Sequence, residues 1–226
     1  MIKSKILFND VITAGLNNEI TWNHVSKAFK QLKTLNEKIK KVEGYSGLPY
    51  PPVRVSPKVE ILIHEYDISG IVHARLNFIK TSNVIIPIVD LNLPFLLYAD
   101  KELLTGVLAH EFLHYMFLAQ KYVNSEYFSL SQYFGGTVIG RIVFDEVYQV
   151  PPEKIFSSKY VVNLLKSKLH KLLSKRGFTK KIVNNWIKKG YPHIKLPSEE
   201  FYIKMSIEEF KNLYFPEEIL RVARQI

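Results

Sequence analysis

The chain has 226 residues, 47% of them apolar, and a formal charge of +10. Because it contains no cysteine, disulfide bonds and thiolate metal sites are excluded. No apolar run reaches the roughly 18 to 20 residues of a membrane-spanning helix, and the first residues lack the apolar segment of a secretory signal. We therefore expect a cytoplasmic protein with no membrane partner.

The positive charge is spread along the chain rather than gathered in one tract. The densest basic cluster, at residues 171–181, reads KLLSKRGFTKK. A basic surface attracts nucleic acid, but scattered lysines are more typical of an ordinary solvated surface. Nucleic acid is therefore the less favoured partner.

The first part of the chain combines one long helix with strands. Residues 19–42 repeat apolar side chains at spacings of three and four, which predicts a helix with Thr21 as its N-cap. A Gly- and Pro-rich loop is expected at 44–57. Three strand-like runs follow, separated by short turns, and they predict a mostly antiparallel meander at 59–66, 70–79 and 83–93.

Helices dominate the second part of the predicted fold. One helix is expected at 100–123 and another at 131–149, where Pro151 and Pro152 break the pattern. The remaining Lys-rich segment is expected to be helical, with a loop at 188–200. The fold class is therefore α+β. We expect an upper subdomain at 1–123 and a helical lower subdomain at 124–226.

The segment GVLAHEFLHYMF, at 106–117, places three ionisable groups inside an apolar helix. On a helix, His110 and His114 stack on one face about 6 Å apart, close enough for both imidazoles to bind one zinc. Glu111 lies about 100° around from His110, at the edge of that face. There it can act as general base on a metal-activated water, the chemistry that hydrolyses amide bonds. A surface helix would carry charges at the flanking positions, but these are uncharged: Val107, Leu108, Phe112, Leu113, Tyr115 and Met116.

The motif resembles the active-site helix of the zincin metallopeptidases, and the order of backing helix, small sheet and HExxH helix is similar to theirs. Metzincins extend the motif with a glycine and a third histidine, where this chain has Phe117 and Gln120. The chain therefore looks like a gluzincin, in particular the compact minigluzincins, in which a glutamate from a later helix completes the site. The resemblance implies that Glu146, 32 residues after His114, is the third zinc ligand.

Other residues compete for the role of third ligand. Asp145 is the alternative by analogy with aspzincins, and whichever of Asp145 and Glu146 does not bind zinc could orient a histidine. Glu126 lies in the loop after the motif helix. His170 or His193 would serve in an SprT-like arrangement with three histidines, although a solvated helix residue and a loop residue are the simpler interpretations.

Hydrolysis also needs a group that stabilises negative charge on the scissile carbonyl oxygen. The candidates are Tyr148, Tyr160 and His193, each of which also suits a structural role. Zincins bind their substrates as an added strand at a sheet edge. Because Pro87 suits an edge position, we expect residues 83–93 to provide that edge.

The sequence thus predicts a zinc-dependent peptidase that acts on a peptide or protein substrate, with Glu111 as general base and His110, His114 and Glu146 as zinc ligands. One alternative is a zinc-binding regulatory or autoinhibited protein with little turnover, whose cleft is covered by residues 153–226. Another is an SprT-like peptidase that acts on DNA-bound proteins, which the charge of +10 would suit. The sequence does not indicate an oligomeric state.

Overall fold

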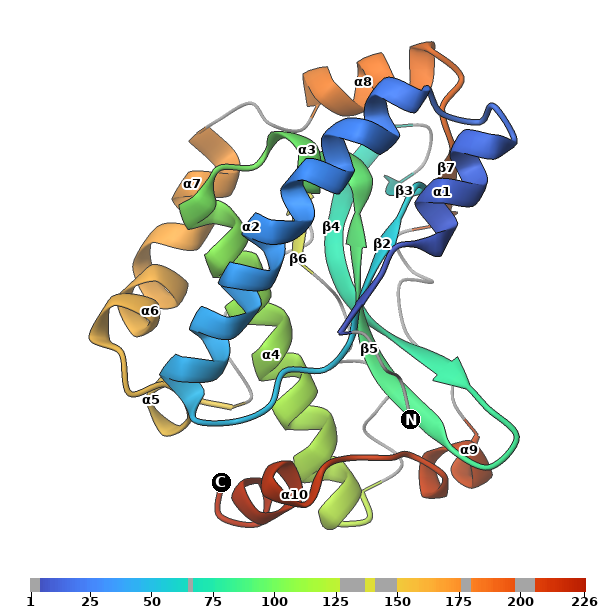
Figure 1. The fold of residues 1–226 in the computed structure, drawn as a ribbon. Helices are drawn as coiled ribbons and strands as arrows, with labels where there is room; N and C mark the ends of the chain where they lie inside the picture. Colours follow the sequence, from blue (N-terminus) through green and yellow to red (C-terminus); the bar gives the residue numbers. More distant parts are fainter. Residues whose placement is uncertain (1–4, 65–66, 127–136, 141–149, 176–179, 198–205) are drawn as a thin grey trace.

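The computed structural model describes residues 5–64, 67–126, 137–140, 150–175, 180–197 and 206–226. Helices lie against a β-sheet, with α2 crossing in front of the strands and α4 running beside them toward the bottom of the view (Figure 1). The predicted α+β class is confirmed at this level. The described strands are β1 (Ile6–Leu7), β2 (Val53–Ser56), β3 (Val59–His64), β4 (Asp67–Lys80), β5 (Ile85–Asn92), β6 (Thr137–Gly140) and β7 (His193–Pro197).

The sheet is mixed rather than mostly antiparallel, which corrects the prediction. Its order is β1-β2-β5-β4-β3-β7, with β6 also paired to β4. The strands β3, β4 and β5 form the predicted antiparallel meander. However, β1 runs parallel to β2, β2 parallel to β5, and β7 parallel to β3. These parallel pairs bring in short strands from outside the meander.

Two of the added strands lie in segments that were predicted to be loops. Val53 and Val55 of β2 are fully buried and alternate with Arg54 and Ser56, which is the period of a strand with one face in the core. The two prolines just before this strand are typical of a loop, and the segment was therefore predicted to be one. At the other edge of the sheet, β7 extends β3 with Val59 opposite His193.

The prediction that residues 83–93 form the sheet edge is wrong, because β5 lies between β2 and β4. Pro87 is nevertheless tolerated, since β2 pairs only with residues 89–92. At the beginning of β5, on the same side as β2, the backbone of Ile85 hydrogen-bonds to residues 212 and 214. Pro87 lies between these two paired stretches, where no ladder hydrogen bond from its nitrogen is required.

The first helices are α1 (Asn9–Leu16), α2 (Trp22–Ser46) and α3 (Leu93–Tyr98), followed by the motif helix α4 (Lys101–Val123). Thr21 caps α2 as predicted, because its side chain accepts a hydrogen bond from the backbone N–H of His24. At the other end, Gly47 has a φ of 66°, a left-handed conformation that closes the helix. The helix α2 packs against both α3 and α4.

The second half of the chain contributes to the same sheet and core. The short helices are α5 (Pro152–Ile155), α6 (Lys159–Asn163), α7 (Leu169–Lys175), α8 (Lys180–Lys188), α9 (Ile207–Lys211) and α10 (Glu217–Ala223), with a π-helical turn, η2, at Leu164–Lys168. Residues 137–140 form β6, paired antiparallel with β4, so the predicted helix at 131–149 is wrong over these four residues. A single hydrophobic cluster includes Val161, Trp186 and Ile219 together with α4. The division into subdomains at residue 123 stays a prediction.

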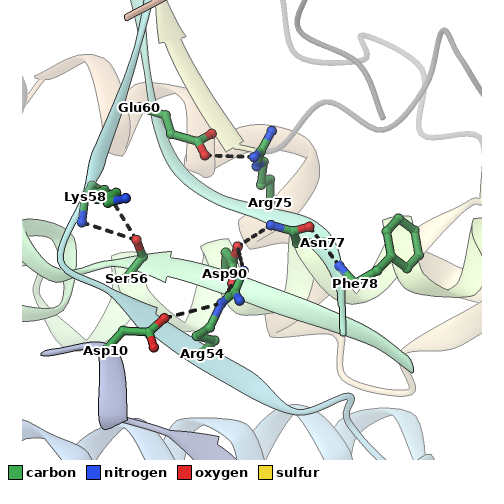
Figure 2. Close-up of polar contacts among 9 residues, drawn as sticks. All are labelled: Asp10, Arg54, Ser56, Lys58, Glu60, Arg75, Asn77, Phe78 and Asp90. Atoms are coloured by element: carbon green, nitrogen blue, oxygen red, sulfur yellow. Dashed lines mark hydrogen bonds and ion pairs between the residues drawn. The ribbon is translucent and has the colours of Figure 1, made fainter. Parts of the chain in front are cut away.

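A polar network covers the outward-facing side chains of the central strands (Figure 2). The Arg54 guanidinium donates two hydrogen bonds to the Asp90 carboxylate, at 2.6 and 2.7 Å, and the amide of Asn77 donates a third. The Arg75 guanidinium pairs with Glu60 at 2.8 Å. These charge-assisted bonds join four adjacent strands and stabilise the register of the sheet.

None of the described helices is long and apolar enough to cross a lipid bilayer.

Candidate metal centre

The helix α4 carries the HExxH motif through the centre of the molecule. Its start is fixed by Asp100, whose carboxylate accepts a 2.7 Å hydrogen bond from the backbone N–H of Leu103. Every residue from Leu103 to Ala119 is buried. A helix that is apolar on all sides must be buried, so polar residues within it need partners or a function.

His110 and His114 converge as the motif predicts. Their Nε2 atoms lie 2.9 Å apart, and the rings meet edge to face with centroids 4.6 Å apart. Two nitrogens bound to one tetrahedral zinc at about 2.0 to 2.1 Å would lie about 3.3 Å apart. The observed separation is therefore within about half an ångström of that of a zinc-bound pair. The two Nε2 atoms thus lie at hydrogen-bond distance and would need to separate by about 0.4 Å to hold a zinc ion.

Burial keeps both imidazoles neutral at physiological pH. It lowers the pKa of His114 to about 4. Burial also lowers the pKa of His110 well below its ordinary value, and the neighbouring His114 adds to that effect. A neutral imidazole has the free lone pair that a metal ion requires. Neither imidazole therefore has to lose a positive charge before it binds a cation.

Glu111, which follows His110 in the sequence, is fully buried. Its carboxylate lies near Tyr50. Burial raises the pKa of Tyr50 well above its ordinary value, and the charge of the Glu111 carboxylate raises it further. The Tyr50 hydroxyl donates a 2.8 Å hydrogen bond to the carbonyl of Leu108, and its ring stacks on Phe112 at 5.4 Å. Tyr50 thus contacts residues on both sides of Glu111 and stabilises the position of this turn of α4.

Tyr50 was missed by the sequence analysis. It stands between prolines in a segment predicted to be a loop, 58 residues before Leu108. The only signal was an aromatic residue in an otherwise turn-like stretch, which gives no indication of a contact with α4.

The predicted third ligand cannot be placed, because Glu146, Asp145 and Tyr148 lie outside the described residues. Within the described part of the chain, no group of three His, Asp or Glu side chains is arranged to hold a metal ion. The described residues therefore provide two imidazoles for the candidate centre, with Glu111 on the same turn of the helix.

The other candidate ligands lie elsewhere. Glu126 follows the end of α4, where its exposed carboxylate pairs with Lys121 and accepts a 3.3 Å hydrogen bond from Asn124. His170 is exposed on α7. His193 begins β7, and its Nδ1 lies 2.9 Å from the carbonyl oxygen of Tyr191.

The structure places Tyr160 against the beginning of α4. Its hydroxyl donates a 3.4 Å hydrogen bond to the carboxylate of Glu102. Glu102 precedes His110 by eight residues, about 12 Å along the helix axis. As an oxyanion-stabilising group, Tyr160 would have to reach across this distance.

Comparisons with protein-family models, curated proteins and solved structures found no match to this chain. The candidate centre is therefore interpreted from its own geometry and chemistry.

Proposed function

We propose that this protein is a zinc-dependent peptidase that hydrolyses peptide bonds in a peptide or protein substrate. The observation that carries the proposal is the 2.9 Å approach of the His110 and His114 Nε2 atoms inside a helix that is otherwise apolar. Burying two imidazoles and a carboxylate there costs folding free energy. A metal-dependent reaction accounts for all three groups together.

In this proposal His110 and His114 hold the zinc ion, and Glu146 completes the set from outside the described residues. A bound zinc would supply a Lewis acid that polarises the substrate carbonyl and acidifies a water molecule. Glu111 accepts a proton from the attacking water and passes it to the leaving amine. Tyr50 keeps this turn of α4 in place through its bond to the Leu108 carbonyl.

The proposal is tested by incubating the zinc-loaded protein with an unbiased peptide mixture and identifying the products by mass spectrometry. Glu111→Gln should reduce cleavage by about 10² to 10⁴-fold, the usual contribution of a general base, while zinc content stays unchanged. Glu102→Gln is the matched control, since it changes a glutamate in the first turn of the same helix. Equal cleavage by the wild type and Glu111→Gln would refute the role of Glu111.

Burial of the site favours a second candidate function. His110, Glu111 and His114 are all at most 7% exposed, so a substrate reaches them only if the surrounding structure moves. A zinc-binding regulatory or autoinhibited protein would need no such access. Zinc binding without cleavage of any peptide in the mixture would favour this alternative.

A further inference from the structure

Four large apolar side chains are exposed where α1 meets α2. They form what we call the apolar corner: Ile12, Leu16, Trp22 and Phe29, which are 39%, 64%, 54% and 66% exposed. Two of the four side chains, those of Trp22 and Phe29, are large aromatic rings. Exposed apolar residues are common when scattered singly, but a group of this kind marks an interaction site.

The apolar corner is continuous across the two helices. Ile12 and Leu16 are one turn apart on α1, and Trp22 and Phe29 are two turns apart on α2, so each pair lies on one side of its helix. The rings of Phe8 and Phe29 meet edge to face at 6.4 Å. The indole of Trp22 lies 3.9 Å from where a Cβ at Gly15 would stand. The two helices therefore present their apolar side chains together.

Lysines continue the same side of α2. Lys33 lies one turn beyond Phe29, and Lys40 lies two turns further, so both share the side of Trp22 and Phe29. Both lysines are exposed, as is Lys30 on the adjoining side. The apolar corner thus ends in a row of positive charges.

Glu37 of α2 is exposed near the lysines, but the other acidic residues beside the apolar corner point elsewhere. Asp10 and Glu19 line a cavity beside Arg54, and the Asp10 carboxylate lies 3.9 Å from the Arg54 guanidinium. On α1, Asp10 is roughly opposite Ile12 and Leu16. The apolar corner therefore faces a partner with more lysines than carboxylates beside it and with Asp10 and Glu19 turned toward Arg54.

We propose that the apolar corner and its lysines dock this protein on a lipid surface that carries anionic headgroups. Helices that lie in a membrane interface are typically rich in Trp, Phe and Leu on one side, with Lys beside them. Their aromatic rings enter the headgroup region, and their lysines bind lipid phosphates. Single-stranded nucleic acid would also suit rings and lysines, but it gains little from aliphatic side chains such as Ile12 and Leu16. This inference is independent of the proposed peptidase activity and departs from the sequence-based expectation of no membrane partner.

The chain offers a built-in reporter for the test. It has two tryptophans. Trp22 is half exposed, whereas Trp186 is only 3% exposed. Full-length protein is titrated with vesicles of phosphatidylcholine, alone or mixed with phosphatidylglycerol, and tryptophan emission is recorded. We expect a blue shift with the anionic vesicles only, quenching by brominated acyl chains, and loss of both signals in Trp22→Phe.

Sedimentation with the same vesicles measures the contribution of each part of the surface. The double variant Trp22→Ser with Phe29→Ser should bind at least about tenfold more weakly, and Lys33→Gln about fivefold more weakly. Tyr214→Ser and Lys211→Gln are the matched controls, because they change exposed residues of the same kinds near α9 and should bind like the wild type. All these positions are on the surface, so thermal melting should show that each variant is folded.

Three results would overturn the inference. The first is no binding to anionic vesicles at low salt, and the second is binding that the Trp22 and Phe29 substitutions leave unchanged. The third is a different occupant: concentration-dependent self-association, or binding of a single-stranded oligonucleotide, that the same double variant abolishes. Self-association would assign the apolar corner to a second copy of the chain.

Discussion

The two long helices, α2 and α4, are similar in length and pack against each other, yet they use polar residues in opposite ways. In α2 the lysines and glutamates lie on the outer side, while five of its 25 residues are buried. In α4 nearly the whole helix is buried, and His110, Glu111 and His114 are buried with it. Solvent stabilises the polar residues on α2. The buried polar residues on α4 need another source of stabilisation, which the proposed zinc ion would provide.

The largest difference should appear when a phenylalanine is removed from each helix. Phe112→Ala on α4 should lower the free energy of unfolding by about 3 to 5 kcal/mol, because it leaves a cavity beside Tyr50. Phe29→Ala on α2 should change it by no more than about 0.5 kcal/mol, because Phe29 is largely exposed. Urea denaturation of both variants measures the two values. Similar losses would show that the two helices are not buried as differently as described.

The histidines of the two helices should differ in their effect on stability at low pH. Burial depresses the pKa of His114 to about 4, so the unfolded chain, with a pKa near 6.5, binds its proton first. The stability that neutral His114 contributes above pH 6.5 is therefore lost as the pH falls toward 4. For the metal-free protein this amounts to about 2 kcal/mol between pH 7 and pH 5.

Replacing each histidine in turn checks this prediction. His114→Gln should flatten the pH dependence of unfolding by about that amount. His24→Gln on α2 should flatten it much less, because His24 is partly exposed and its pKa is lowered less. A steeper pH dependence in His114→Gln would contradict the assignment of a neutral, buried imidazole.

The glycines of the two helices should respond to alanine with opposite signs. A Cβ at Gly106 of α4 would lie 2.8 Å from a methyl group of Leu169, whereas a Cβ at Gly44 of α2 would meet nothing within 4 Å. Gly44→Ala should stabilise the protein by about 0.5 to 1 kcal/mol through helix propensity alone. Gly106→Ala should destabilise it by about 1 kcal/mol, because overpacking outweighs the same gain. Thermal denaturation of the two variants would show whether the signs differ.

The N-caps give the smallest expected difference. The Asp100 carboxylate accepts its capping bond at 2.7 Å and carries a charge, whereas the Thr21 hydroxyl accepts at 3.4 Å. Asp100→Ala should therefore cost about 1 to 2 kcal/mol and Thr21→Ala about 0.5 kcal/mol. Equilibrium unfolding resolves a difference of this size, and the reverse order would contradict the roles assigned to the two caps.

The sequence predicted those elements whose signals are local. The start of α4 at Asp100, the cap at Thr21 and the β3-β4-β5 meander follow from side-chain periodicity, capping residues and turns within a few positions. The convergence of His110 and His114 follows equally directly, because a spacing of four on a helix fixes it.

The remaining strands depend on contacts that local patterns do not report. The strand β2 is short and follows two prolines, and its pairing with β1 and β5 makes it a strand. Residues 137–140 were predicted to be helical as part of the longer segment 131–149, but they form a strand paired with β4. The place of β5 inside the sheet likewise depends on β2, so the proline in β5 was misread as an edge signal.

The central claim is that the two histidines of α4 hold a metal ion and that His24, the histidine of α2, does not. The most direct test loads metal-free protein with zinc and measures the bound zinc by calorimetry and by elemental analysis, for the wild type, His110→Ala and His24→Ala. We predict that the wild type and His24→Ala bind a single zinc per chain with equal affinity, and that His110→Ala binds it at least about tenfold more weakly. A wild type that takes up no zinc, or a His110→Ala variant that binds it equally well, would contradict the claim.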